Sequence, residues 1–419
     1  MEITFLGGAK EVGKSAVLVR GDQRSILLDY GAQTGREPSF PMHVQPKTVD
    51  SILLTHAHLD HSGGVPLFFL RRGPDLVTTE VSLELSLILL RDFIKLSGFY
   101  LQFESSDLLL MERSTRQIKV NDSIKVANEF VARFPSSGHI PGGTTIVLQH
   151  DGKSVLYTGD ISLRDSQLLS GADLNFGKLD AVITESTYSQ SEHDPREKIE
   201  NDFVQFANEV VERGGVLLVP AFSVGRAQEI ACVLRARNFT HRVAMDGMAL
   251  KTNEILFRHQ EYLRDPELFR KTMENIEVVT SWGQRKKLVQ TPSVIISPAG
   301  MLAGGASVFY NQEISGESKN GISIVAFQVP GSPGRTLLDK GLVISNGKSR
   351  RVKAEIRRFD FSGHAGRSEL FELFKHIEGN PVVYTVHGDG DSCEKFAQEV
   401  KERFGFQASA PSVGDKVTV

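Results

Sequence analysis

The sequence predicts an α/β protein with two domains, and three observations support this prediction. The chain has 419 residues, which is enough for two domains of ordinary size. Up to about Glu185 it consists mainly of short apolar runs separated by glycine and polar clusters, as in a β-rich domain. From about Asp194 onward, helix-like and strand-like segments alternate, which is typical of a parallel-sheet α/β unit.

The apolar runs of the first part predict buried strands, because each ends in a polar cluster. These runs are residues 16–19, 26–29, 52–55 and 154–157. One long helix is expected from Ser82 to Lys95, where apolar residues recur at helical spacing. The first domain is therefore expected to be mostly β-structure with a single long helix.

The second part is expected to contain helices and strands in turn, with strand-then-helix segments continuing after about Arg358. A helix near Ile199 to Arg213 leads to a strand at 216–219, and a second helix starts near Arg226. Later strands are expected at 294–296 and 322–326. Residues 348–358 carry six cations against one anion and are interpreted as one basic strand, although such a charge run is most often a solvated face.

Composition narrows the class of protein. The chain is 40% hydrophobic and 24% charged, with 38 glycines, which fits a soluble globular enzyme rich in turns. No apolar run approaches the roughly 20 residues that span a bilayer, and the first residues indicate a strand where a secretion signal would carry basic residues. With only Cys232 and Cys393, the chain offers no disulfide framework and no thiolate zinc site, so we expect a cytoplasmic protein. The net charge of −3 gives no bulk indication of nucleic-acid binding.

A dense cluster of metal-binding side chains follows the third expected strand. His56, His58, Asp60 and His61 lie within six residues, and the chain has only 12 histidines in all. Imidazole nitrogen and carboxylate oxygen are ligands that zinc prefers. The cluster therefore predicts a site for one or two zinc ions, in preference to a solvated polar loop.

Three further residues are weak signals taken singly and gain weight from their order along the chain. Asp29 ends the strand at 26–28, His139 precedes the glycine pair 142–143, and Asp160 ends the strand at 154–157. In contrast, residues 8–15 satisfy the pattern of a phosphate-binding P-loop. A P-loop needs a helix next, whereas the β-branched run that follows is typical of a strand, so we do not expect ATP binding.

With these residues the sequence resembles the metallo-β-lactamase superfamily. The resemblance implies that His56, His58 and His139 hold one zinc ion and that Asp60 and His61 belong to the other. It also implies that His387 is a ligand, that Asp160 bridges both ions, and that Asp29 orients a ligand histidine.

The downstream half resembles the β-CASP branch of that superfamily. Its three motifs match Glu185 in residues 184–188, His364 in 360–365 and His387 in 386–388. Segments 220–229, 297–302 and 331–335 also look like family segments. The closest likeness is to the short archaeal and bacterial nucleases that are similar to cleavage-and-polyadenylation specificity factor and lack KH domains. The resemblance implies an αββα sandwich from residues 1–190 and 358–419, with an inserted α/β β-CASP cap domain at 191–357.

The function that the resemblance implies is a zinc-dependent ribonuclease. Two zinc ions about 3.5–4 Å apart can lower the pKa of a shared water that attacks the phosphodiester. Asp60 would accept the proton of that water, and His364 would donate a hydrogen bond or a proton near the scissile phosphate. Glu185 would orient His364 or another histidine of the site. The products would carry a 5′-phosphate and a 3′-hydroxyl.

Several residues are expected at the substrate, with single-stranded RNA as the expected partner. We expect His364 at the start of a helix, so that backbone N–H groups near Ser362 and Gly363 can bind a phosphate. Arg226 and Arg335 are ambiguous between phosphate contacts and structural hydrogen bonds, and the basic stretch 348–358 is a candidate wall of the RNA path. The resemblance leaves open a homodimer, and also a place in an RNA-processing or RNA-decay complex.

Other functions are weighed against the ribonuclease. A small-molecule hydrolase on the same metal core would not need the long insertion. DNA nucleases of the branch usually have valine at the third motif, where this chain has His387, and non-catalytic scaffolds have lost ligands that this chain retains. Relatives often have Asp where this chain has Gly366, and often another residue where it has Pro141. Both differences leave every proposed metal ligand in place, so they affect substrate fit more than metal binding. Endonuclease and 5′-to-3′ exonuclease activity are not distinguished by the sequence.

Overall fold

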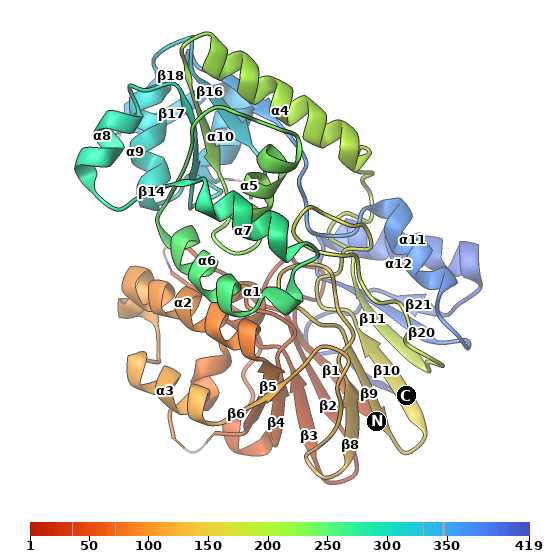
Figure 1. Ribbon diagram of the computed structural model, residues 1–419. Coiled ribbons are helices and arrows are strands. Elements are labelled where there is room, and N and C mark those ends of the chain that lie inside the picture. The colour runs from red at the N-terminus through yellow and green to blue at the C-terminus, as the bar shows by residue number, and fades with distance from the viewer. Residues whose placement is uncertain (36, 72, 330, 346–347) are drawn as a thin grey trace. The chain divides into compact units, whose positions relative to one another are not determined.

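The chain folds into two compact units, each described here by itself (Figure 1). The computed structural model describes residues 1–419 except 36, 72, 330 and 346–347. The first unit contains Met1–Asp165, Gly171–Glu192 and His364–Val419, and the second contains Ser166–Ser170 and His193–Gly363. The chain therefore leaves the first unit and returns to it, which makes the second unit an insertion. The short loop Ser166–Ser170 belongs to the inserted unit, a feature that the sequence did not indicate.

The first sheet of the first unit has seven strands in the order β22-β1-β2-β3-β4-β5-β6. Their bounds are β1 Glu2–Gly7, β2 Ala16–Arg20, β3 Ser25–Leu28, β4 Ser51–Leu53, β5 Asp75–Thr79, β6 Thr115–Ile118 and β22 Lys416–Thr418. Because β22 pairs with β1, the return segment completes this sheet. The strand β2 directly follows residues 8–15, so the P-loop pattern there is not followed by a helix.

The second sheet also has seven strands, in the order β21-β20-β11-β10-β9-β8-β7. Their bounds are β7 Ser123–Val126, β8 Phe130–Arg133, β9 Ile146–His150, β10 Lys153–Tyr157, β11 Ala181–Glu185, β20 Val382–Val386 and β21 Ala408–Ser409. The strand β20 pairs in parallel with β11, so in Figure 1 the blue C-terminal strands lie beside the yellow ones.

Alternation of side chains along the strands explains why the two sheets stack. In β2, Val17 and Val19 pack into the core that both sheets share, whereas Ala16 and Leu18 face the opposite side. The side opposite the shared core is covered on the first sheet by α2 and α3, and on the second sheet by α11 and α12. This arrangement confirms the expected sandwich of two sheets between helices.

The helices of the first unit include the long one expected from the sequence. Their bounds are α1 Leu59–Ser62, α2 Glu80–Ser97, α3 Ser105–Arg113, α11 Arg367–Lys375 and α12 Gly390–Phe404, with 3₁₀ turns at Pro46–Thr48, Val65–Phe68 and Gly98–Tyr100. The long helix expected from Ser82 to Lys95 is confirmed as α2, and α3 is a shorter helix that was not expected. Two of its apolar residues, Leu108 and Met111, are buried against the first sheet.

The inserted unit is a six-stranded sheet in the order β14-β13-β15-β12-β16-β19, and all its neighbouring strands are parallel. The strands are β12 Val216–Pro220, β13 Val243–Asp246, β14 Glu277–Val279, β15 Ser293–Ser297, β16 Gly321–Ile324 and β19 Glu355–Arg358. The helices are α4 Arg196–Glu212, α5 Arg226–Ala236, α6 Met248–Arg258, α7 Pro266–Glu274, α8 Trp282–Leu288, α9 Gly305–Ile314 and α10 Pro333–Lys340, with a 3₁₀ turn at Gln260–Tyr262. The expected alternation of helices and strands is confirmed.

The prediction of one basic strand over residues 348–358 was wrong. The segment divides into β18 (Lys348–Arg351), which forms a two-stranded hairpin with β17 (Leu342–Ser345), and β19 in the six-stranded sheet. Between them Ala354 is buried in the core, and its N–H bonds to the carbonyl of Ser315. The two strands are thus separated by three residues, 352–354.

Among the described residues, no helix combines the length and the apolar character that would let it cross a bilayer.

Candidate metal centre

The candidate metal ligands of the first unit lie in the loops that follow strands of its two sheets. His56 and His58 follow β4, Asp160 follows β10, and His387 follows β20 directly. Asp60 and His61 lie in the short helix α1, and His139 precedes β9. Residues far apart in the chain therefore converge because the strand ends that carry them are neighbours.

Four of these side chains form a first group. The possible ligand atoms of His56, His58, His139 and Asp160 all lie within 4.8 Å of one another. His58 Nδ1 is 3.0 Å from His139 Nε2, and Oδ2 of Asp160 is 3.4 Å from His139 Nε2 and 3.5 Å from His56 Nε2.

A second group shares Asp160 with the first and adds Asp60, His61 and His387, again within 4.8 Å. The other carboxylate oxygen of Asp160, Oδ1, is 3.1 Å from His61 Nε2 and 3.6 Å from His387 Nδ1. The Oδ2 atom of Asp60 is 3.4 Å from His387 Nε2. Asp160 thus directs one oxygen to each group, which is the arrangement a bridging carboxylate requires.

The donor atoms fit a metal cation. His56 Nε2, Asp160 Oδ1 and His387 Nε2 are buried and have no hydrogen-bond partner among the described residues, although unsatisfied buried polar atoms are costly. Burial lowers the pKa of His56 well below its usual range and that of His58 to about 4, so both rings are neutral at pH 7 and offer a lone pair. Nitrogen and carboxylate donors of this kind suit zinc.

Asp29 fixes the orientation of His61. Its fully buried carboxylate accepts hydrogen bonds from His61 Nδ1 at 2.7 Å, from the N–H and hydroxyl of Thr55 at 2.8 Å each, and from the Tyr157 hydroxyl at 3.1 Å. With Nδ1 held in this way, Nε2 of His61 faces the second group. Asp29 has a φ of 55°, a conformation that costs energy in a residue other than glycine and that the surrounding bonds maintain.

Sequence analysis missed three residues that support the ligands. Tyr157 and Thr55 bind Asp29, and Thr55 Oγ1 also lies 3.0 Å from His56 Nδ1. Thr187 Oγ1 lies 3.1 Å from His387 Nδ1. A signal was present, because Thr55 directly precedes the histidine cluster and Thr187 lies two residues after Glu185.

His364 lies beside the two groups and is paired with Glu185. Its Nδ1 is 2.9 and 3.1 Å from the two carboxylate oxygens of Glu185, and its Nε2 is 3.9 Å from Asp160 Oδ2. Burial opposes a charge on this ring, but the carboxylates of Glu185 and Asp160 outweigh it and raise the pKa of His364 to about 9. Its side chain is 21% exposed, compared with 1% for His56 and 4% for His387, so solvent reaches His364 more readily than these two rings.

The residues expected to contact substrate lie in the inserted unit, and they are Arg226, Arg335, Ser362 and Gly363. The expectations of free N–H groups near Ser362 and Gly363 and of a helix that starts at His364 were wrong. The N–H of Ser362 donates to Asp360 Oδ1 at 3.2 Å, so it is not free. The next helix, α11, begins only at Arg367, and the N–H of its N-cap Gly366 is satisfied by Glu369. The N–H groups of Ser362 and Gly363 are therefore not at a helix N-terminus.

Two arginines complete that set. Arg226 is the first residue of α5, and Arg335, in α10, pairs with Asp339 at 2.7 Å. That ion pair is an exposed i, i+4 contact, which is consistent with a structural role for Arg335.

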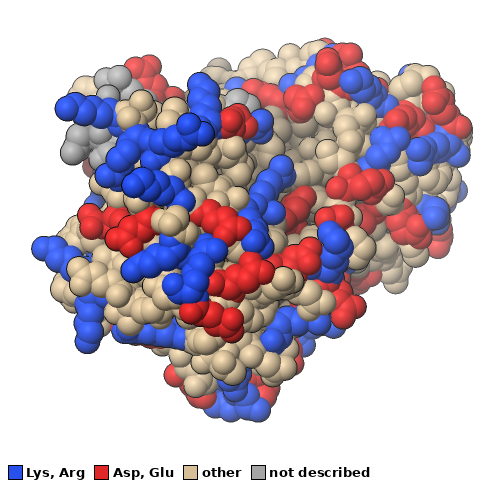
Figure 2. All heavy atoms as spheres, turned by 90° about the horizontal axis from the view of Figure 1, so that it is seen from above, with Lys and Arg blue, Asp and Glu red and all other residues tan. Residues whose placement is uncertain are grey.

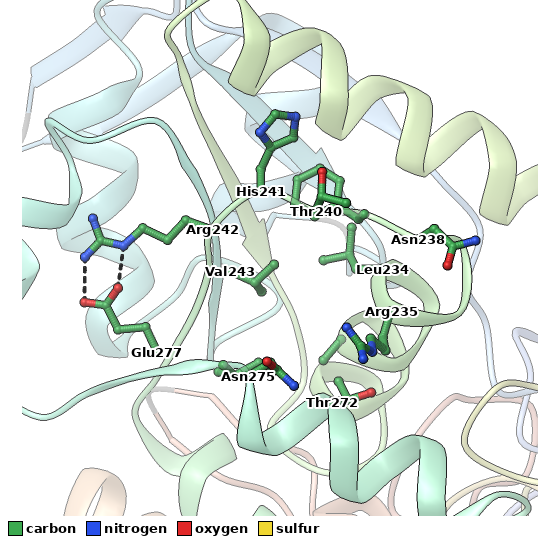
Figure 3. Close-up of a pocket in the computed structure, with 13 residues that line it drawn as sticks. Leu234, Arg235, Asn238, Thr240, His241, Arg242, Val243, Thr272, Asn275 and Glu277 are labelled. Carbon is green, nitrogen blue, oxygen red and sulfur yellow. Dashed lines mark hydrogen bonds and ion pairs between the residues drawn. The ribbon is translucent and has the colours of Figure 1, made fainter.

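The inserted unit also contains a cavity of about 480 Å³ (Figure 3). It lies where α5 and α7 end and β13 and β14 begin, and Figure 3 shows Arg242 bound to Glu277 at its edge. None of the residues predicted for the metal centre or the substrate lines this cavity. It is therefore a feature of the inserted unit by itself.

Three family profiles match consecutive parts of the chain. Residues 9–193 match the metallo-β-lactamase superfamily, residues 227–337 the Beta-Casp domain, and residues 349–411 the Zn-dependent metallo-hydrolase RNA specificity domain. These three segments include all the residues of both metal-binding groups, together with Glu185 and His364.

Curated relatives are similar over the whole chain. RNase aCSPSF2 of Saccharolobus solfataricus is 35% identical, and the match covers 100% of this chain and 85% of that relative. Probable RNase MJ4 of Methanocaldococcus jannaschii is 34% identical over the full length of both proteins. Transcription termination factor FttA of the same organism is 30% identical, with 100% of this chain and 72% of that relative covered.

A solved structure shares the fold. It is a protein of unknown function from Enterococcus faecalis V583 that is 15% identical to this chain, with a TM-score of 0.65. The match covers 100% of this chain and 99% of that one.

Proposed function

The chain belongs to the metallo-β-lactamase superfamily and carries its inserted Beta-Casp domain, and we propose from this premise that it is a ribonuclease that uses two zinc ions to hydrolyse RNA. The observation that carries the proposal is the position of Asp160, which has one oxygen toward each of two neighbouring groups of ligand atoms. The matched RNA specificity domain and the relatives named RNases support RNA as the substrate.

His56, His58 and His139 would hold one zinc ion, Asp60, His61 and His387 the other, and Asp160 both. When bound, the two ions lower the pKa of a water molecule and neutralise charge that develops on the phosphate. Asp29 and Thr187 keep the rings of His61 and His387 oriented toward the second ion through their Nδ1 atoms.

Asp60 is the proposed proton acceptor. Burial would favour its neutral form, but the neighbouring His387 and His61 outweigh this effect and lower the pKa of Asp60, so the carboxylate is ionised. Its side chain is 34% exposed, and a water molecule can therefore reach it from solvent.

His364 is the proposed proton donor to the leaving 3′-oxygen, which leaves a 5′-phosphate on the other fragment. Glu185 binds Nδ1 with both oxygens and also accepts the N–H of Ile161 at 2.8 Å, so it is anchored to the backbone. The ring is thereby held with Nε2 toward the metal-binding groups, and a proton on Nε2 can pass to the leaving oxygen.

The substrate class and the mode of cleavage are tested together in one experiment. The purified chain is incubated with a single-stranded RNA labelled at either end, in 5′-monophosphate and 5′-triphosphate forms, with DNA of the same sequence and with a small acyl ester. We expect internal or 5′-end cleavage of the RNA, no reaction with the ester, and loss of cleavage in the Asp160→Ala variant. Hydrolysis of the ester without cleavage of RNA would contradict the proposal. Cleavage of DNA in preference to RNA would show that the protein is a DNA nuclease.

A further inference from the structure

Trp282, the only tryptophan of the chain, lies on the surface of the inserted unit with 58% of its surface exposed. It is the first residue of α8, and the capping box formed by Ser281 and Gln284 fixes the backbone at that point. Tryptophan is enriched at binding surfaces, because its ring is largely apolar and its N–H can still form a hydrogen bond.

The indole ring is held from two sides. Phe309 of α9 meets it edge-on, with ring centroids 5.1 Å apart at 88°, and the guanidinium of Arg285 lies 4.9 Å from its centre. Arg285 is itself fixed by two bonds to the buried Asp246, at 2.7 and 2.9 Å. Because its position is already restricted, the ring loses little conformational freedom when a ligand stacks on it.

Helix α9 contacts both Trp282 and a cation of the neighbouring hairpin. One turn after Phe309, the carbonyl of Gln312 accepts a 2.7 Å hydrogen bond from Nη2 of Arg350 in β18. Lys348, two residues before Arg350, shares its side of the hairpin. Lys286 lies one turn after Trp282 in α8 and so shares its side of the helix. We call Trp282, Lys286, Lys348 and Arg350 the Trp282 surface.

The cations of the Trp282 surface are not neutralised by acids. In the described part of the chain, the exposed Lys286, Lys348 and Arg350 make no ion pair, whereas the exposed Lys271 and Arg335 of the same unit pair with Glu267 and Asp339. The helix α9 contributes one exposed carboxylate, Glu313, next to Gln312. The three cations of the Trp282 surface therefore outnumber the acids of α9.

The figures locate this region in the inserted unit. Figure 1 draws α8, α9, β17 and β18 at the upper left. Figure 2 views that end from above and shows Lys and Arg side chains gathered on the left of the face.

We propose that the Trp282 surface binds single-stranded RNA, with a base stacked on the indole and neighbouring phosphates paired with Lys286, Lys348 and Arg350. A single strand offers an unpaired base next to each phosphate, which matches an aromatic ring surrounded by cations, whereas a duplex keeps its bases inside. Both kinds of contact are independent of sequence. The proposal deepens the ribonuclease function, on which it rests, by adding a second contact with the substrate.

The single tryptophan provides the test, because its fluorescence reports on this surface alone. The full chain with His364→Ala, which should bind RNA without cutting it, is titrated with a 15-nucleotide oligouridylate in the presence of zinc. We expect saturable quenching of the fluorescence. With three phosphates neutralised, the salt slope should be about −2, so that affinity falls about 20-fold between 50 and 200 mM salt.

Matched variants separate the Trp282 surface from the rest of the chain, with binding followed by the anisotropy of labelled RNA. Trp282→Ala should weaken binding by about 5- to 150-fold, from a stacking energy of about 1–3 kcal/mol per base. Arg350→Glu should also weaken it, whereas Lys271→Glu, a charge reversal at an ion-paired lysine, and Phe99→Ala, a truncation at an aromatic residue that is 94% exposed, should not. Trp282→Phe, which keeps an aromatic ring, should retain part of the affinity and serves if Trp282→Ala does not fold.

Three results would overturn the proposal. RNA could bind by anisotropy without any change in fluorescence, or Trp282→Ala and Trp282→Phe could both bind as tightly as Phe99→Ala. Fluorescence could instead depend on protein concentration in the absence of RNA, which would show that a second copy of the chain covers the tryptophan. The titration requires no cleavage, so absence of quenching would leave the ribonuclease proposal standing. Conversely, quenching without any cleavage by the wild-type chain would refute the ribonuclease proposal and not RNA binding at the Trp282 surface.

Discussion

Replacing His364 and His387 one at a time separates proton transfer from metal binding. Both histidines lie in segments that look equally loop-like in sequence, but their surroundings differ. His387 is 4% exposed, lies 3.4 Å from Asp60 and has a buried Nε2 without a hydrogen-bond partner in the described structure. His364 is 21% exposed and bound by Glu185, and its Nε2 is 3.9 Å from Asp160. We therefore expect His387→Ala to lose one zinc ion and His364→Ala to retain both.

The expected loss of activity in His364→Ala follows from its role. A general acid contributes about 100- to 10,000-fold in rate, which corresponds to about 2.7–5.4 kcal/mol at 1.36 kcal/mol for each factor of ten. Among the described residues, His364→Ala leaves the carboxylate of the buried Glu185 with one partner, the N–H of Ile161, so we also expect lower stability. His364→Asn is the matched control, because its amide nitrogen takes about the position of Nδ1 and can still donate to Glu185, but it cannot transfer a proton.

The assay combines the zinc content of each purified variant with the initial rate of RNA cleavage under saturating RNA. Both His364 variants should keep two zinc ions per chain and lose most of the rate, whereas His387→Ala should lose both one ion and the rate. The reasoning is refuted if His364→Asn loses zinc while His387→Ala retains it, since the two roles would then be reversed.

Three further variants test the supporting structure. Asp160→Ala removes the oxygens directed to both groups and should lower zinc content at both, and full zinc content in this variant would exclude a bridging role. Tyr157→Phe removes the 3.1 Å hydrogen bond to Asp29 without changing the shape of the core. Zinc affinity, measured against a competing chelator, should therefore fall about 10- to 100-fold. An unchanged affinity would contradict the supporting role that we assign to Tyr157. Gly31→Ala would place a Cβ 1.7 Å from the carbonyl oxygen of Asp60. We therefore expect the free energy of unfolding, measured with urea, to fall by about 1–3 kcal/mol and zinc binding to weaken. Wild-type stability would mean that this loop is not tightly packed.

The parts of this fold that sequence patterns predicted were those with local causes. The strand β2 is an apolar run bounded by polar residues, and both of its faces are buried, as such a run indicates. The cluster of His56, His58 and His61 could be identified because its ligand groups are close in the chain. His139, Asp160 and His387 could not be joined to it from spacing, because only pairing between distant strands brings them together, and they depended on the family resemblance.

The errors also have physical reasons. The charge pattern of residues 348–358 does not express the burial of Ala354 between the hairpin and the sheet. The start of α11 at Arg367 has a local signal in the sequence, namely Glu369, whose side chain accepts the N–H of the N-cap Gly366. Tyr157 was missed because a tyrosine at the end of an apolar strand resembles a core residue, and only the structure reveals its bond to Asp29.

Titration of zinc into chelator-treated protein, with RNA cleavage measured at each step, tests the central claim most directly. If Asp160 serves two ions that act together, binding should saturate at two zinc ions per chain, and most of the activity should appear only as the second site fills. Full activity at one zinc ion per chain would contradict the account, and so would failure of zinc to restore cleavage.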